Sequence, residues 1–353
     1  MLAVVYHAPG DVRVEERPVP RIGPGELLLG IESASICATD LRIVQGGHRK
    51  YTPGVMRVPG HELVGTIVEM GAGVKDLVVG LRVFVAPNIG CGKCPPCGSG
   101  RNNLCADYEA FGITMDGAFA EYMRVTAAAV EQGNVIPIPG HLDGAAAALA
   151  EPFACVLHGQ ETVGVGANDA VLVEGAGPIG LMHVMLARLR GARRVMVSDL
   201  SPDRLRKAGE LGAHRTVNVA EEDLSAVVAA ETTGHGVDVV IVATAARAAQ
   251  EQALALAAQG GRINFFAGLP RQQSEILIDA NLMHYRELVL TGTTGCSTGD
   301  CRAAANLIIS GKVDLAPLIS LRYPLKDAVQ ALAAARDGSN LKVILEPHMK
   351  GTT

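Results

Sequence analysis

The stretch AVLVEGAGPIGLMHVMLARLRGARRVMVSD, residues 170–199, decides the fold of this chain. It consists of an apolar run, a glycine-rich turn, a helical pattern and a second apolar run that ends at Asp199. The same alternation of strand and helix fills most of the chain between about residues 151 and 290. Alternation of this kind predicts an α/β domain whose parallel strands are joined by right-handed crossovers and covered by helices on both faces.

The turn GAGPIG follows the first strand and opens the first helix, which is the context that a dinucleotide-binding turn requires. Gly175 allows the tight turn, Gly177 lets a pyrophosphate approach the backbone, and Gly180 allows close packing of helix on strand. Pro178 and Ile179 complete the turn at the helix N-terminus, where unpaired N–H groups favour an anion. The alternative is an ordinary helix-opening turn, which the strand, the helix and Asp199 together disfavour.

An acidic residue at the end of the second strand, Asp199, lies nineteen residues after Gly180. A carboxylate there can accept hydrogen bonds from both ribose hydroxyls and repels a 2′-phosphate, so the sequence favours NAD over NADP. Arg204 follows five residues later. It could soften this preference, or it could be a solvated arginine on the next helix.

The remaining sequence predicts a second, β-rich domain. Residues 1–150 contain short apolar runs at close spacing, broken by Gly and Pro, such as LLLGIESASI and VVGLRVFVAP. Residues 291–353 contain two helical patterns and a closing strand, KVILEP. We therefore expect domains at 1–150 and 151–290, followed by a C-terminal segment at 291–353.

Four cysteines lie within fifteen residues of the first domain, in CGKCPPCGSGRNNLC. Four thiolates in a loop curled by Gly and Pro satisfy the tetrahedral coordination of a structural Zn²⁺, here at Cys91, Cys94, Cys97 and Cys105. A disulfide knot or a set of reactive thiols is the alternative. The N-terminus has no basic n-region of a secretory signal, and disulfides are rare in reducing compartments. The sequence therefore favours a closed zinc site, which has no open position for chemistry.

A second group of metal-ligand types is scattered along the sequence. A thiol, an imidazole and a carboxylate are all ligands that Zn²⁺ accepts, and three protein ligands plus water leave an open, catalytic site. The candidates are Cys37 in SICATDLR, His61 and Glu62 in VPGHELVG, and Glu151 in LAEPFACVLHG. Each alone is as well explained by packing. Cys155, Cys296 and Cys301 are expected to be buried reduced thiols.

Composition excludes several classes of protein. The chain has 353 residues, 48% hydrophobic and 19% charged, and a net charge of −5. No Lys/Arg-rich run is present, which argues against nucleic-acid or anionic-membrane partners. No apolar stretch has the ~18 residues of a membrane-spanning helix. A cytoplasmic protein is the expectation.

With these motifs in this order, the chain resembles the zinc-dependent medium-chain dehydrogenases, the family of alcohol, sorbitol and threonine dehydrogenases. The resemblance covers essentially the whole length. It implies a GroES-like catalytic domain, formed by the N-terminal part and the C-terminal tail, and a Rossmann domain between them. It also implies two zinc ions per subunit, NAD as cofactor, a small-molecule alcohol as substrate, and a homodimer or homotetramer.

The resemblance also implies roles for individual residues. Cys37 and His61 would bind the catalytic zinc, Glu62 or Glu151 would be the third protein ligand, and the sequence does not rank the two carboxylates. Asp40 would accept a hydrogen bond from the His61 ring. Thr39 would contact the substrate oxygen and pass its proton outward while hydride moves to the cofactor.

Two positions distinguish this chain within the resemblance. Glu151 stands where alcohol dehydrogenases have a cysteine, which indicates the polyol branch. Arg42 stands where many relatives have a relay histidine, and an arginine cannot act as a base near neutral pH. The proton would then leave through water, a cofactor hydroxyl or another group such as His48.

The substrate expected is a polyol, cyclitol or sugar alcohol, phosphorylated or not. The chain has no Trp and only 3% aromatic residues, so it has few side chains that could line a pocket for a bulky aromatic alcohol. Basic and hydroxyl-binding side chains near the expected site could meet hydroxyls or an anionic group; these are Arg42, His48, Arg49 and Lys50. L-Threonine dehydrogenation is the nearest alternative. A non-catalytic zinc protein that senses NAD is a second one.

Overall fold

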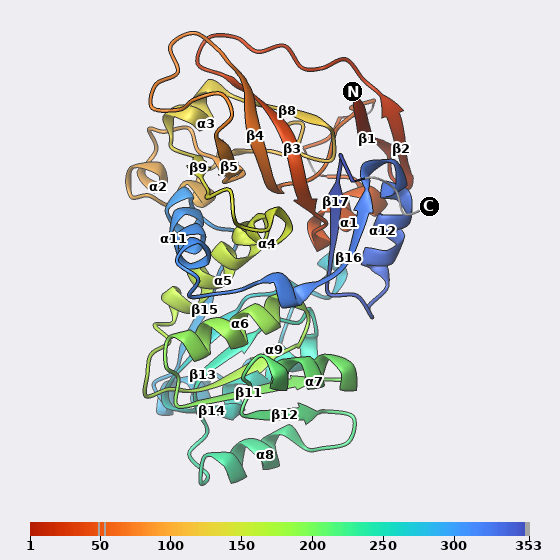
Figure 1. Cartoon of the computed structure of the whole chain (residues 1–353). Coiled ribbons are helices and arrows are strands. Elements are labelled where there is room, and N and C mark those ends of the chain that lie inside the picture. The colour runs from red at the N-terminus through yellow and green to blue at the C-terminus, as the bar shows by residue number, and fades with distance from the viewer. Residues whose placement is uncertain (49, 53, 350–353) are drawn as a thin grey trace. The chain divides into compact units, whose positions relative to one another are not determined.

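The computed structural model describes residues 1–48, 50–52 and 54–349 (Figure 1). Internal contacts divide the chain into two units, one made of Met1–Ala154 with the chain from Cys296 onward, the other of Cys155–Gly295. Helix α5 (Ala150–Thr162) runs through the first boundary. The predicted pairing of a β-rich domain with a parallel-sheet α/β domain is confirmed. Among the described residues, no helix has the length and apolar character needed to cross a membrane.

The unit of residues 155–295 contains a six-stranded parallel sheet of order β12-β11-β10-β13-β14-β15. Its strands are β10 (Ala170–Glu174), β11 (Arg194–Asp199), β12 (Arg215–Asn218), β13 (Val237–Val242), β14 (Ala257–Phe265) and β15 (Val289–Gly292). Its helices besides α5 are α6 (Pro178–Leu189), α7 (Pro202–Glu210), α8 (Leu224–Glu231), α9 (Arg247–Leu256), α10 (Ala280–Tyr285) and the 3₁₀ turn η2 (Arg271–Gln273).

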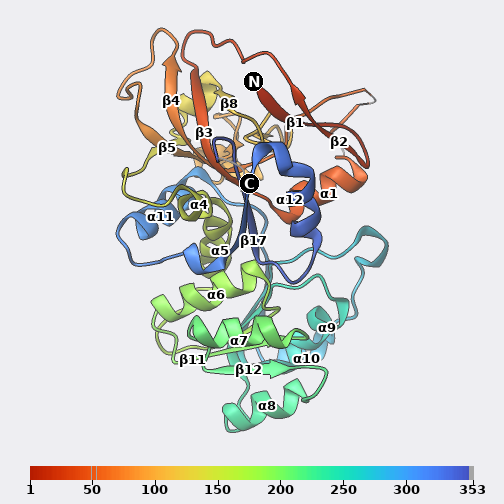
Figure 2. The ribbon, with the colours of Figure 1, turned by 45° about the vertical axis from the view of Figure 1, so that its right-hand side comes forward.

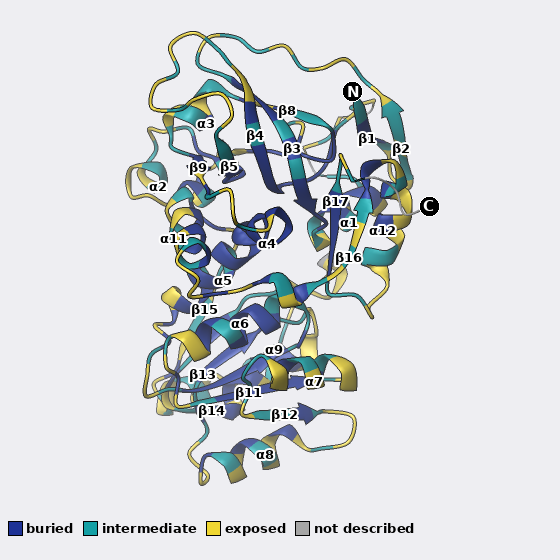
Figure 3. Ribbon diagram, in the orientation of Figure 1, coloured by how far each residue is buried: buried dark blue, intermediate teal, exposed yellow. Residues whose placement is uncertain are grey.

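Helices cover both faces of this sheet. Val173 faces Gly180 of α6, and the next residue, Glu174, hydrogen-bonds Gln252 of α9. Because consecutive residues of a strand point to opposite faces, α6 and α9 lie on opposite faces of the sheet. In Figure 1, α6 and α7 lie on the near side, and Figure 2 turns the unit to show α9 and α10. β10 is buried along its whole length, and its neighbours β11 and β13 are mostly buried (Figure 3), as central parallel strands must be.

One helix of this unit is shorter than the sequence predicts. The helical pattern AAQEQALALAAQGG continues to Gly261, but α9 ends at Leu256 and β14 begins at Ala257. Gly260 has φ +69°, in the left-handed region, and a Cβ on Gly261 would crowd the Ala258 carbonyl oxygen. The alanine-rich end of the pattern has good helix propensity, but the chain is already extended at Ala257, and the paired glycines lie inside β14 where its register with β13 shifts.

The other unit is built on an antiparallel sheet of order β16-β17-β3-β4-β5-β9, with β8 added to β3, and a hairpin of β1 and β2. Its strands are β1 (Leu2–Ala8), β2 (Asp11–Glu16), β3 (Leu27–Ser35), β4 (Glu62–Met70), β5 (Arg82–Val85), β6 (Asn88–Ile89), β7 (Glu109–Ala110), β8 (Tyr122–Val125), β9 (Val135–Pro137), β16 (Ile319–Pro324) and β17 (Lys342–Glu346). Among the described strands of this sheet, only β16 and β17 pair in parallel.

The unit also contains short helices and 3₁₀ turns. They are α1 (Ala38–Gly46), α2 (Pro95–Gly98), α3 (Ala127–Glu131), α4 (Gly144–Ala148), α11 (Thr298–Ile309), α12 (Ala328–Arg336), η1 (Asn102–Leu104), η3 (Ala316–Leu318) and η4 (Leu325–Asp327). Of these, α4 and α12 pack on the sheet. The C-terminal strand β17 pairs with β3, with Ile344 opposite Ser35. The chain therefore returns to the sheet that begins with β3, near the N-terminus.

Candidate active site

The candidate metal ligands Cys37, His61 and Glu62 meet at one end of the antiparallel sheet. β3 pairs with β4 so that Ser35, near the end of β3, lies opposite Glu62, at the start of β4. The chain that leaves β3 at Cys37 and the chain that enters β4 at His61 therefore meet at the same edge. The donor atoms of Cys37, His61 and Glu62 all lie within 4.8 Å of one another.

Local structure fixes both connections. Cys37 is the N-cap of α1, and its sulfur accepts a hydrogen bond from the Thr39 N–H at 3.5 Å. Gly60, before His61, has φ +96°, and a Cβ there would overlap the Phe119 ring. The turn into β4 thus requires glycine, both for its backbone conformation and for its space.

Asp40 connects the two segments. Its carboxylate is completely buried; Oδ2 accepts from the Cys37 N–H at 2.9 Å and Oδ1 from the Gly60 N–H at 3.3 Å. Oδ1 also lies 3.3 Å from His61 Nδ1. A carboxylate at Nδ1 orients the ring and leaves Nε2 for a metal. The geometry supports the role that the resemblance implies for Asp40.

The negative charges beside His61 act on the pKa of its ring. Burial alone lowers the pKa of the ring, but the charges of Asp40 and Cys37 outweigh burial and raise the pKa of His61 well above its ordinary value. A metal needs the neutral imidazole, so metal binding here must displace a proton.

The two candidate carboxylates have different surroundings. Glu62 belongs to the group of Cys37 and His61, whereas Glu151, on α5, is not in that group. Glu151 Oε1 instead lies 3.7 Å from Cys296 Sγ. Burial has the largest effect and raises the pKa of Glu151; the charge of His61 lowers this pKa and the charge of Glu62 raises it. Glu151 therefore lies near the group without joining it.

Lys342 is a site residue that the sequence analysis missed. Its Nζ donates to both oxygens of Glu62, at 2.6 and 2.9 Å, and to the Ile36 carbonyl at 3.3 Å. Burial opposes the ammonium charge, but the Glu62 charge outweighs it and raises the pKa of Lys342. The sequence feature that could have indicated Lys342 is a lysine at the start of the otherwise apolar run KVILEP. Its partner depends on the pairing of β17 with β3.

Thr39 and Arg42 lie on consecutive turns of α1. Arg42 Nη2 donates to Thr39 Oγ1 at 3.1 Å, and the Arg42 side chain is exposed. Lys50 Nζ donates to the Tyr108 carbonyl at 2.8 Å and lies over the Tyr108 ring. His48 Nδ1 accepts from the Lys50 N–H. Arg49 lies outside the described residues.

The remaining cysteines are reduced. Cys296 and Cys301 are fully buried, as expected, with their sulfurs 3.4 Å apart. Cys155 is only half-buried, because α5 leaves part of its surface uncovered, so the expectation of burial is wrong for this residue.

The four-cysteine lobe has the geometry of a closed metal site. The sulfurs of Cys91, Cys94, Cys97 and Cys105 all lie within 4.8 Å of one another. Backbone N–H groups of Lys93 and Cys94 point at the Cys91 sulfur and lower its pKa to about 6. A thiol set of this kind fits Zn²⁺, which binds thiolates.

The glycine turn in the α/β unit has the conformation expected of each glycine. Gly175 has φ +103°, and a Cβ on Gly180 would overlap the Gly175 carbonyl oxygen. Gly177 is the N-cap of α6 and Pro178 occupies its first turn, followed by Ile179. Asp199 ends β11; its Oδ2 accepts from the Ala176 N–H at 2.6 Å and its Oδ1 from the Ser201 N–H at 2.9 Å.

Arg204 is not a solvated helix arginine. It is half-buried on α7, and its Nη1 lies 3.9 Å from the position that a Cβ on Gly177 would take. Its guanidinium therefore lies beside the glycine turn, where it adds positive charge near the α6 N-terminus.

Glu174, just before the turn, was also missed. It is 2% exposed, Gln252 donates to its Oε1 at 2.8 Å, and burial raises its pKa to about 7. Since this value exceeds the ordinary one, the folded protein keeps a proton that the unfolded chain loses, and stability falls as pH rises from about 4 to 7.

We expect Glu174→Gln to be more stable than the parent above pH 7, by about 2 to 3 kcal/mol, because it removes a buried carboxylate. The difference should vanish near pH 4, where both side chains are neutral. Urea unfolding between pH 4 and 8 measures it. A difference that is constant with pH would show that Glu174 does not titrate on unfolding.

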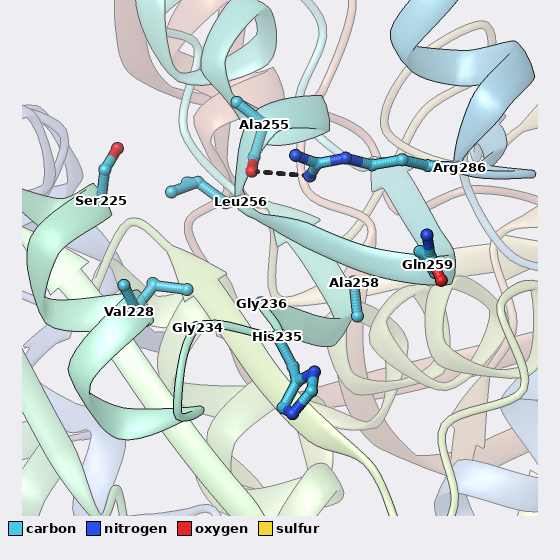
Figure 4. A pocket seen from close by; sticks show the side chains of 11 residues that line it. Ser225, Val228, Gly234, His235, Gly236, Ala255, Leu256, Ala258, Gln259 and Arg286 are labelled. Carbon is cyan, nitrogen blue, oxygen red and sulfur yellow. Dashed lines mark hydrogen bonds between the residues drawn. The ribbon is translucent and has the colours of Figure 1, made fainter.

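A separate hollow of about 510 Å³ opens in the α/β unit, between α8 and the start of β14 (Figure 4). Arg286 lines it and donates to the Ala255 carbonyl at 3.2 Å. Gly236, which precedes β13, also lines it, so it lies at the opposite end of the strands from the glycine turn. It contains none of the predicted site residues.

Known proteins share this architecture. The chain matches the model of the alcohol dehydrogenase GroES-like domain over residues 23–139 and that of zinc-binding dehydrogenase over residues 178–310. It is 37% identical over 342 residues to L-threonine 3-dehydrogenase of Thermococcus kodakarensis, covering 94% of each chain.

Two solved structures extend the comparison. A putative zinc-binding dehydrogenase from Sinorhizobium meliloti, bound to NADP, is 35% identical with a TM-score of 0.90, covering 98% of this chain and 99% of the other. Galactitol-1-phosphate dehydrogenase from Escherichia coli is 28% identical with a TM-score of 0.88, covering 98% and 100%.

Proposed function

The chain belongs to the zinc-dependent medium-chain dehydrogenase family, and from that membership we propose that it transfers a hydride from the secondary alcohol of a polyol, cyclitol or sugar alcohol, phosphorylated or not, to NAD, giving a ketone. The observation that carries the proposal is the buried donor group of Cys37, His61 and Glu62. Thiol, imidazole and carboxylate within one small volume fit a zinc site that keeps a position for substrate. A structural role would need no such open position.

The residues have separate tasks in this reaction. Cys37, His61 and Glu62 would hold the zinc, with Asp40 fixing the His61 ring and Lys342 balancing the Glu62 charge. Zinc supplies Lewis acidity at the alcohol oxygen, and NAD supplies the hydride acceptor. Thr39 takes up the proton that the alcohol loses. Glu151, which lies outside the donor group, would be the second carboxylate available to hold the metal.

A substrate panel followed by NADH absorbance tests the proposal. It should contain polyols and their phosphates, cyclitols, L-threonine, and simple secondary alcohols of similar length. We expect kcat/KM for the best polyol to exceed that for any simple aliphatic alcohol by at least about tenfold, since extra hydroxyls add hydrogen bonds. Preference for simple alcohols with no polyol turnover would overturn the substrate class.

L-Threonine is the second candidate, because the relative from Thermococcus kodakarensis is named for that activity. Threonine is also a secondary alcohol, so the same residues would act on it. Turnover of L-threonine with none of any polyol would favour this candidate. A protein that only senses NAD would bind NADH with no turnover of any alcohol in the panel.

For the cofactor, we propose NAD bound at the turn of Gly175, Gly177, Pro178, Ile179 and Gly180, with Asp199 at the ribose and Arg204 beside the pyrophosphate. The similar dehydrogenase from Sinorhizobium meliloti is bound to NADP, so the preference of this chain for NAD over NADP needs a direct test. Asp199→Asn removes the charge but keeps one acceptor oxygen for the backbone. We expect it to raise the affinity for NADPH relative to NADH by at least about tenfold, because the repulsion of the 2′-phosphate is lost.

Fluorescence titration with each reduced cofactor measures this ratio without any substrate. Asp203→Asn, on the exposed first turn of α7, is the matched control, because it removes a nearby charge that does not contact the turn. An unchanged ratio in Asp199→Asn would mean that Asp199 does not select the cofactor.

We also propose that the protein assembles as a homodimer or homotetramer through the free edge of the six-stranded sheet. β15 is the last strand of the described sheet, and Val289 on it is 51% exposed; two further large apolar side chains of the same unit, Leu277 and Tyr285, are 79% and 75% exposed. An exposed apolar sheet edge pairs readily with a second copy. Light scattering should give a multiple of the 36.7 kDa chain mass, and Val289→Lys should lower it. A 36.7 kDa particle would contradict the proposal.

A further inference from the structure

Arg42 and Thr39 form a contact that the proposed reaction does not yet use. Both lie on α1, three residues apart and therefore on one face of the helix. Arg42 Nη2 donates to Thr39 Oγ1 at 3.1 Å. Thr39 is half-buried, two residues after Cys37, while Arg42 extends toward solvent. The contact links the residue that would meet the substrate to an exposed positive charge.

The chemistry of the two groups requires Arg42 to be the hydrogen-bond donor and Thr39 Oγ1 to be the acceptor. A guanidinium has only donors and stays charged at any working pH, so it cannot accept a proton from Thr39. A hydroxyl has two lone pairs and one proton. Arg42 occupies one lone pair of Oγ1, which leaves the other lone pair and the proton for different partners.

We infer that Arg42 is a positioning residue in the reaction proposed above, on which this inference rests: it holds the Thr39 hydroxyl so that its one free lone pair faces the substrate hydroxyl and its proton faces water. The Thr39 proton leaves Oγ1 to water as the substrate proton moves to Oγ1, so Oγ1 never carries both protons. One O–H bond forms and one breaks at Oγ1, so the hydroxyl ends unchanged. The proton exits past residue 42 without passing through it.

The charge of Arg42 contributes to the same step. Oγ1 gains negative character as its own proton leaves, and a cation within hydrogen-bond distance stabilises that charge. Other charged groups of the site, Asp40, His61, Glu62 and Lys342, are buried and bond partners other than Arg42. A variant at position 42 therefore isolates the contribution of the guanidinium.

The test compares Arg42→Gln and Arg42→Lys with the parent enzyme on its best substrate. Loss of a charge-assisted hydrogen bond used in the reaction should lower kcat of Arg42→Gln by about ten- to a hundredfold. KM should stay within about twofold, because Oγ1 is still present to meet the substrate. Arg42→Lys should regain part of the loss, because an ammonium can still donate to Oγ1.

Isotope effects separate this role from a structural one. With Arg42 absent, proton transfer should limit the rate more strongly, so the solvent deuterium isotope effect on kcat should rise. In a Thr39→Val background, Arg42→Gln should cost nothing further, because the shared step is already lost. Arg13→Gln is the control: it is an exposed arginine of the same unit that bonds the side chain of Asp11.

A readout without turnover distinguishes failure of this inference from failure of the proposed function. In protein labelled with [¹⁵N]arginine, the Arg42 Nη2–H signal at low temperature should exchange slowly with solvent, and Thr39→Val should speed that exchange. Unchanged exchange, unchanged kcat in Arg42→Gln, or equal loss in both Thr39 backgrounds would each overturn the inference. A parent enzyme that oxidises no secondary alcohol would overturn the proposed function, even with the contact present.

Discussion

Cys37→Ser is expected to lower turnover of every secondary alcohol by at least about a thousandfold and to remove one of two zinc ions per chain. Serine at this position is a much weaker zinc ligand than a thiolate. A Lewis-acid metal supplies several kcal/mol of transition-state stabilisation, and about 4 kcal/mol corresponds to a thousandfold in rate. The fold should persist, because Cys37 is half-buried and caps a short helix rather than filling the core.

Elemental analysis with kinetics on the same preparation measures both effects. Cys97→Ser is the matched variant: it should also lose one zinc, but from the four-cysteine lobe. Cobalt substitution then identifies the remaining metal in each variant, because four thiolates give an intense charge-transfer band and a single thiolate gives a weak one. A Cys37→Ser protein with full zinc content and undiminished turnover would show that the catalytic site lies elsewhere. If Cys37→Ser lost one zinc ion but the parent protein also oxidised no alcohol, the protein would be a non-catalytic zinc protein.

Lys342→Met is expected to lower the free energy of unfolding by about 3 to 5 kcal/mol in the metal-free protein. Lys342 is 5% exposed and Glu62 is not exposed at all, so removing the ammonium leaves a buried carboxylate without its charge partner. Breaking a buried pair costs more than the pair contributes, because the remaining charge is neither hydrated nor paired.

Urea unfolding gives the difference, and two further variants interpret it. Lys342→Met with Glu62→Gln should recover most of the loss, since the unpaired charge is then gone. Lys326→Met, an exposed lysine of η4 in the same unit, should change stability by less than about 0.5 kcal/mol. In zinc-loaded protein the loss should shrink, because the metal charge also balances Glu62. If Lys342→Met were as stable as Lys326→Met, the ion pair of Lys342 and Glu62 would not contribute to the free energy of unfolding.

The sequence predicted those features whose partners are close along the chain. GAGPIG lies between a strand and a helix, and the close contact of Gly180 with the Gly175 carbonyl oxygen joins residues only five positions apart. The four cysteines of residues 91–105 converge because the loop that joins them is short. Asp199 lies at the end of its strand because the length of one strand–helix–strand unit is nearly fixed.

Features that depend on distant segments needed the tertiary structure. The sequence offered Glu62 and Glu151 as equal candidates, and only the pairing of β3 with β4 shows that Glu62 joins Cys37 and His61. Lys342 reaches Glu62 across 280 residues because β17 pairs with β3. The site assignments themselves stay predictions until metal and substrate are measured.

By itself, then, the sequence determined the family, the α/β architecture, the glycine turn and the cysteine lobe, since periodicity and short-range spacing specify them. The tertiary structure decided which carboxylate joins the thiol and imidazole, which buried cation balances it, and that Arg42 contacts Thr39 rather than solvent alone. The physical reason is that the energy of a buried charge depends on the groups that contact it. Strand pairing brings these groups together from distant parts of the chain, and their separation in sequence does not reveal the contact.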